Sequence, residues 1–169
     1  GICATGASEK IGRNEIDKIM TPLAVQHGAK GLAWMRVTNE GVESSIAKFF
    51  SEEKLQEIVK VFDAKPGDYL FFVADKWSVT WSALAAGRNY CGEKLELADP
   101  NLLAFAWIID YPMYELDEES GKIDFSHNPF SMPQGGLDDL ENKDPLDILA
   151  YQYDIICNGF ELSSGAVRN

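Results

Sequence analysis

An Asn158-Gly159 pair separates two strand-like runs near the end of the chain, and this pair restricts the local fold more than any other feature. On a regular strand, residues seven apart point to opposite faces, so Asp154 and Glu161 share a face only if the chain turns between them. Asn-Gly is the preferred pair for a tight hairpin turn. The sequence therefore predicts a hairpin that brings both carboxylates onto one face.

The side chains around this turn have a common chemistry. Asp154 and Glu161 offer hard oxygen ligands suited to Mg²⁺ on a nucleotide. Ser163–Gly165 supplies small residues and backbone donors where a ligand can approach closely, and Arg168 has a planar guanidinium that matches a carboxylate in two hydrogen bonds. Taken singly, Glu161 and Arg168 are explained as surface charges, and His127 as a structural side chain. Together these residues indicate a site for a small anionic substrate.

Charge is distributed unevenly along the chain. Residues 1–103 carry 12 Lys/Arg and 14 Asp/Glu, whereas residues 104–169 carry 3 and 13. Without a basic stripe to contact many phosphates, we do not expect tight nucleic-acid binding by this chain alone. The acidic second part suits divalent cations, although a solvated acidic face explains the charge equally well.

The size and hydropathy of the chain indicate how many domains it can form and whether it can span a membrane. The chain has 169 residues and is 46% hydrophobic, enough for one core, or for one domain and part of another. Its longest apolar run, Leu102–Ile109, has the length of a buried strand, so we expect no membrane span and a cytoplasmic protein. Cys3, Cys91 and Cys157 are widely spaced and odd in number, which indicates reduced thiols.

Helical and strand patterns alternate through residues 1–103, which predicts one two-layer α+β domain. The expected order is a helix from Ile16 to Gly28 that Pro22 kinks or splits, a strand over 31–37, a short helix to Phe50, a helix capped by Ser51, a strand over 69–74 and a helix ending near Gly92.

Strands and turns dominate the predicted second domain, residues 104–169. We expect extended segments over 105–111, 113–116 and 123–126 with a turn over 118–121, an exposed polar loop over 134–144, a helical turn over 145–150 and a strand over 151–157.

Three segments of the second part read AWIIDYPMYE at 106–115, HNPFS at 127–131, and YD through NGFE to GAVR within 153–168. They closely resemble bacterial-type aspartyl-tRNA synthetases of class II. Upstream, GAKGLAW at 28–34, IAKF at 46–49, and GD through FVAD within 67–75 resemble the GAD domain inserted in the catalytic domain of that family. The resemblance covers essentially the whole chain, which we interpret as a fragment of a longer enzyme.

The resemblance implies two domains. Residues 1–103 are expected to form an N-terminally incomplete GAD-type domain, with helices on a mainly antiparallel sheet. Residues 104–169 are expected to form strands of a class II catalytic sheet. It implies a ligase that condenses aspartate with ATP to aspartyl-adenylate and transfers the aspartyl group to the 3′ end of tRNA. ATP and Mg²⁺ are the implied cosubstrate and metal, and the parent enzyme is implied to be a homodimer. The dimer motif and part of the ATP site are not found, so we expect the chain alone to be inactive.

Residue roles follow from the matched motifs. His127 and Arg168 are implied to bind aspartate, Glu161 to bind ATP, and Asp154 with Glu161 to bind the metal, whereas no catalytic residue is assigned. The chain departs from many family members at Asn128, where they have a second histidine. It also departs at residues 163–164, where serines replace glycines. Both departures affect the expected shape of the pocket.

Two other functions compete with this interpretation. A GAD-type tRNA- or protein-interaction module of a tRNA-dependent amidotransferase subunit accounts for the first hundred residues, but it has no need of His127 or of the tail from Glu161 to Arg168. An acidic α+β interaction domain, in which the C-terminal motifs are only strand edges, is the third hypothesis. Unchanged binding of Mg²⁺-ATP and aspartate after substitution of Glu161 and Arg168 would favour it.

Overall fold

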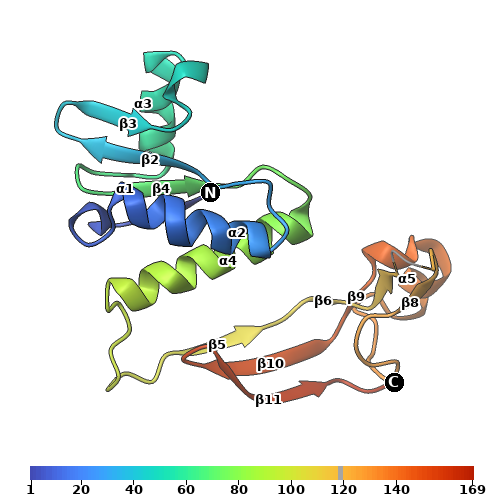
Figure 1. Ribbon diagram of the computed structural model, residues 1–169. Helices are drawn as coiled ribbons and strands as arrows, with labels where there is room; N and C mark the ends of the chain where they lie inside the picture. The colour runs from blue at the N-terminus through green and yellow to red at the C-terminus, as the bar shows by residue number, and fades with distance from the viewer. Residues whose placement is uncertain (118–119) are drawn as a thin grey trace. The chain divides into compact units, whose positions relative to one another are not determined.

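The computed structural model describes residues 1–117 and 120–169 and divides the chain into two compact units, residues 1–99 and 100–169. Both units combine helices with antiparallel strands, which confirms the predicted α+β class (Figure 1). In the described part of the chain, no helix is long and apolar enough to cross a membrane.

An antiparallel sheet of four strands forms the centre of the first unit. In spatial order its strands are β1 (Ile2–Ala4), β4 (Tyr69–Phe72), β2 (Ala33–Thr38) and β3 (Gly41–Ser44). The sequence patterns predict β2 and β4 but miss the short edge strands β1 and β3, because three or four residues give too little alternation to recognise.

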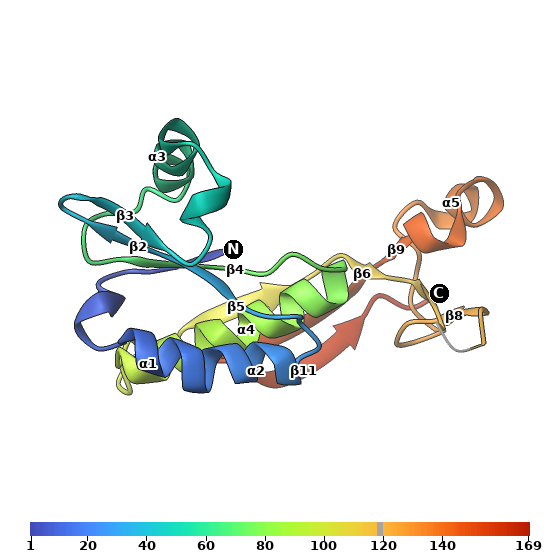
Figure 2. The same ribbon diagram turned by 45° about the horizontal axis from the view of Figure 1, so that its top comes forward.

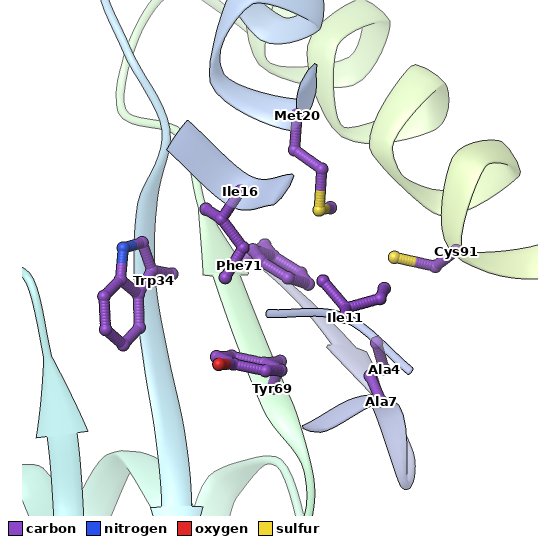
Figure 3. Close-up of a cluster of buried hydrophobic side chains, with 9 residues drawn as sticks. All are labelled: Ala4, Ala7, Ile11, Ile16, Met20, Trp34, Tyr69, Phe71 and Cys91. Carbon is purple, nitrogen blue, oxygen red and sulfur yellow. The ribbon is translucent and has the colours of Figure 1, made fainter. Parts of the chain in front are cut away.

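Helices cover both faces of this sheet, as Figures 1 and 2 show. On one face, Leu70 packs in a cluster with Met35 and with Leu55 of α3 (Glu52–Val61). On the other face, Phe71 packs with Ile16 and other buried residues (Figure 3). The helices thus form one layer more than the two-layer arrangement expected, because consecutive residues of β4 are apolar and point to opposite faces.

The predicted helix from Ile16 to Gly28 is one helical course in three segments: α1 (Arg13–Glu15), the π-helical η2 (Ile16–Met20) and α2 (Thr21–Gln26). Pro22 lies in the first turn of α2, directly after the wider π turn, so the helix continues past the proline. The predicted end is confirmed: Gly28 has φ +89°, and its N–H bonds the Val25 carbonyl at 2.9 Å.

The remaining elements of this unit are η1 (Ala7–Glu9), η3 (Ala47–Phe49) and α4 (Trp77–Lys94). The predicted cap of α3 is confirmed, since Ser51 Oγ accepts a hydrogen bond from the Lys54 N–H at 3.3 Å.

The described residues of the second unit form three small sheets. One has the order β11 (Phe160–Ala166), β10 (Gln152–Cys157), β5 (Phe105–Ile108), and the others pair β6 (Tyr111–Pro112) with β9 (Leu149–Ala150) and β7 (Tyr114–Leu116) with β8 (Ile123–Phe125). The turn predicted over 118–121 includes residues 118–119, which lie outside the described residues.

The predicted loop over 134–144 is wrong in its middle. Residues Gly136–Asn142 form the helix α5, followed by the 3₁₀ turn η4 (Pro145–Asp147) near the predicted helical turn. Two acidic residues in the first turn of α5 interact favourably with the helix dipole. One of them, Asp139, also forms an ion pair with Lys143 four residues later, with 2.7 Å between Oδ2 and Nζ. The polar, glycine-rich composition hid this short helix from a periodicity argument.

Candidate ligand-binding pocket

A pocket of about 310 Å³ lies in the second unit and contains all four residues expected at the site, His127, Asp154, Glu161 and Arg168. Its other lining residues are Tyr111, Asn128, Gln152, Ser164, Gly165 and Ala166. The structure therefore brings together side chains from β6, the segment after β8, β10, β11 and the chain that follows β11.

The hairpin predicted at Asn158-Gly159 is confirmed. Both residues have positive φ, +51° and +85°, and the strands close on the pair Cys157–Phe160. Glu161 of β11 lies opposite Ile156 of β10, and Ile156 is two residues after Asp154 on β10. Because the side-chain period of a strand is two, the carboxylates of Asp154 and Glu161 are on one face, as the turn predicts.

A β-bulge follows this pair and changes which residues of β11 reach the pocket. Between Ile155 and Ile156 the register shifts, so that Ser163 lies opposite Ile155 and Leu162 is the extra residue. Ser164 then lies opposite Asp154 and lines the pocket, whereas Ser163 does not. The sequence grouped the two serines. As consecutive strand residues they point to opposite faces, and the bulge places Ser164 on the face of Asp154 and Glu161.

Arg168 follows β11 and is held by the segment after His127. A β-bridge joins Ser131 and Arg168, and the neighbouring Met132 N–H donates to the Val167 carbonyl at 2.8 Å. The guanidinium lies over the Phe130 ring, 5.8 Å from its centre. Among the described residues Arg168 has no carboxylate within ion-pair distance, so its charge is available to an anionic ligand.

Asp154 has a neutral partner in the pocket, since the Tyr111 hydroxyl donates a hydrogen bond to its Oδ2 atom. This bond, followed by burial and by the charges of Asp154 and Glu161, raises the pKa of Tyr111 to about 12. The Tyr111 ring also meets His127 edge to face, with 5.1 Å between ring centres. The sequence did not single out Tyr111, although it lies inside the recognised segment 106–115.

Gln152 is a second lining residue that sequence reasoning missed. Only 8% of the residue is exposed, and its Nε2 atom donates to Ser131 Oγ at 2.7 Å. Counting back by two from Asp154 places Gln152 on the same face, which is the signal that could have found it. Asn128, noted in the sequence as a departure, closes a turn by accepting the Phe130 N–H at Oδ1, 2.8 Å away.

The acidic pair suits a metal that is bound together with a ligand. No cluster of three or more His, Cys, Asp or Glu that could hold a metal ion occurs among the residues described. Mg²⁺ is commonly bound by one or two carboxylates together with substrate phosphates and water. Asp154 and Glu161 on one face therefore fit a nucleotide-bound Mg²⁺ and not a site made only of protein ligands.

Comparisons with known proteins cover both units. A family model described as the GAD domain matches residues 1–84. The chain is 55% identical over 147 residues to the aspartate–tRNA ligase of Streptomyces coelicolor, covering 86% of this chain and 25% of that protein. It is 51% identical over 146 residues to the aspartate–tRNA(Asp/Asn) ligase of Chlorobium chlorochromatii, covering 86% and 24%.

A third relative, the aspartate–tRNA(Asp/Asn) ligase of Wolbachia pipientis subsp. Culex pipiens, is 48% identical over 158 residues, which cover 93% of this chain and 26% of that protein. The chain thus spans about a quarter of the length of the curated relatives it matches. Residues 1–84 belong to the GAD domain family, and 86–93% of the chain is 48–55% identical to one part of these aspartate–tRNA ligases.

Proposed function

We propose that this chain supplies the GAD domain and one wall of the substrate pocket of a class II aspartate–tRNA ligase. The observation that carries the proposal is the pocket itself, which combines an Arg168 without an ion-pair partner among the described residues with the two carboxylates Asp154 and Glu161. The parent enzyme joins aspartate and ATP into aspartyl-adenylate and passes the aspartyl group to the 3′ end of tRNA.

The four pocket residues that the sequence singled out each have a part in this proposal. Arg168 binds a carboxylate of aspartate through its guanidinium, and His127 lies in the same amino-acid site. Glu161 lies at the ATP site, and Asp154 with Glu161 holds Mg²⁺ that accompanies the nucleotide. When bound, Mg²⁺ supplies positive charge that offsets repulsion between the carboxylate and the α-phosphate. The protein's own contribution is to hold the two anionic substrates in an orientation that favours attack.

The amidotransferase alternative is supported by the GAD domain alone. The identity to ligases extends over 147 residues, well beyond residues 1–84. The additional stretch contains pocket residues that an amidotransferase module does not require. The GAD domain therefore fits both functions, and the stretch beyond it favours the ligase.

An isolated chain of these 169 residues is proposed to lack activity. In the three-stranded sheet, Phe105, Trp107 and Phe160 are each more than half exposed, so the described residues leave this apolar face open. The resemblance to class II enzymes supports a cytoplasmic, homodimeric parent protein that binds ATP and tRNA.

The test is aspartate-dependent exchange of pyrophosphate into ATP by the full-length protein that contains these residues. We expect Arg168→Ala to raise the KM for aspartate by about 100-fold, because it removes the cationic partner of the substrate carboxylate. Lys122→Ala, which removes a cation outside the pocket, serves as the matched control. An unchanged KM for aspartate in Arg168→Ala would contradict the proposed function. Exchange activity in the isolated chain of 169 residues would contradict its proposed inactivity.

A further inference from the structure

Two short-range interactions determine where the Arg168 guanidinium lies. Its Nη1 atom is 3.4 Å from Asn128 Oδ1, and its Cζ atom lies over the Phe130 ring. Arginine has only donors, so Asn128 must present its carbonyl oxygen to the guanidinium, as it does to the Phe130 N–H. The side chain of Arg168 is thus placed by the turn over residues 128–131.

The backbone of Arg168 is placed by the same segment. Ser131 forms the β-bridge with Arg168, the Asn169 N–H donates to the Phe130 carbonyl at 3.2 Å, and the Met132 N–H donates to the Val167 carbonyl. A displacement of the turn over 128–131 would therefore move both the backbone and the guanidinium of Arg168.

The buried side-chain amide of Gln152 holds this turn through hydrogen bonds. Gln152 Nε2 donates to Ser131 Oγ at 2.7 Å and lies 3.4 Å from the Asn128 carbonyl oxygen. Gln152 is 8% exposed and Ser131 is fully buried. A buried polar pair is costly unless it is hydrogen-bonded, so the two side chains hold each other in one arrangement.

We propose that Gln152 is a positioning residue that sets Arg168 for aspartate binding through Ser131 and the turn over 128–131. The inference rests on the proposed function, because it takes Arg168 as the group that contacts the carboxylate of aspartate. Gln152 itself does not react. Its amide fixes the turn, the turn fixes Arg168, and a correctly placed guanidinium binds aspartate without first having to be ordered.

Steady-state exchange kinetics on the full-length protein test this relay. We expect Gln152→Leu to raise the KM for aspartate by about tenfold and to change the KM for ATP by less than about twofold, because an unpaired Ser131 releases the turn. Ser131→Ala removes the acceptor with little change of volume and should give the same pattern. Cys157→Ala, a buried substitution at the other end of β10 and outside the pocket, is the control for a loss of stability alone.

A double-mutant cycle separates positioning from a purely structural role. If Gln152 acts through Arg168, then adding Gln152→Leu to Arg168→Ala changes the aspartate KM by less than about twofold. The inference would be overturned if the aspartate KM of the double variant rose by the product of the two single fold changes. It would also be overturned if the KM were unchanged in both Gln152→Leu and Ser131→Ala. Either result would leave the proposed function intact. An unchanged KM in Arg168→Ala alone would instead remove the proposed function.

A crystal structure of the Gln152→Leu protein supplies a readout that does not depend on activity. The expected result is an Arg168 guanidinium displaced from Asn128 Oδ1 and from the Phe130 ring. Retention of both contacts in the variant would contradict the relay.

Discussion

Glu161 and Arg168 are seven residues apart on one stretch of chain and nevertheless line the same pocket. On an uninterrupted strand, an odd separation places two side chains on opposite faces. The bulge at Leu162 adds one residue between them and restores a common face. The proposed ATP-site carboxylate and the proposed aspartate-binding cation therefore depend on a single irregularity of the strand pairing.

Exchanging the last two residues of this stretch tests the face on which Arg168 lies. The double substitution Val167→Arg/Arg168→Val moves the cation by one position, and we expect it to raise the aspartate KM as strongly as Arg168→Ala does. The reason is that a neighbouring residue on extended chain points away from the pocket. Arg168→Lys, which keeps the charge in place, should be milder. Normal aspartate KM in the exchanged protein would contradict this account of the bulge.

Removing the charge of Glu161 tests the metal assignment. We expect Glu161→Gln to lower the exchange rate by about 100-fold and to raise the Mg²⁺ concentration needed for half-maximal rate, because one hard oxygen ligand loses its charge. The measurement is exchange rate against Mg²⁺ concentration. Glu141→Gln, on α5 and outside the pocket, is the control. Identical Mg²⁺ dependence in the two variants would argue against a role for Glu161 with the metal.

Stability at high pH tests the hydrogen bond between Tyr111 and Asp154. The pKa of Tyr111 is raised to about 12, above the ordinary value of about 10, so its hydroxyl contributes its full stabilisation below about pH 10 and loses it as the pH rises to about 12. We expect Tyr111→Phe to lower the free energy of unfolding by about 1 kcal/mol at neutral pH. Urea unfolding at increasing pH should show this difference shrinking. Tyr151→Phe, outside the pocket, is the control, and a constant difference for Tyr111→Phe would count against the bond.

A methyl group at Gly165 tests the packing behind the pocket wall. Gly165 lies opposite Tyr153, and a Cβ at this position would be 2.6 Å from the ring atom Cε2. We expect Gly165→Ala to destabilise the protein by about 1–3 kcal/mol in thermal unfolding, because the ring must move. Adding Tyr153→Leu should recover part of the loss. Gly31→Ala, where nothing lies within 4 Å, is the control.

Local chemistry was sufficient to predict much of the fold. Ser51 predicted the start of α3, Gly28 the end of α2, and Asn158-Gly159 the hairpin, because each feature depends on φ angles or hydrogen bonds within a few residues. The same reasoning failed at α5, whose glycines and acidic residues resemble a loop, and it missed the short strands β1 and β3.

For the pocket, the sequence by itself determined the chemical types: two carboxylates, a histidine and an arginine, ordered around a turn that could bring the carboxylates together. Only the tertiary structure decided that Arg168 lies on the same face as Glu161, that Ser164 and not Ser163 lines the wall, and that Gln152 supports the turn over 128–131. The physical reason is that a bulge and a buried hydrogen bond depend on how separate segments pair, and no local pattern of residues specifies that pairing.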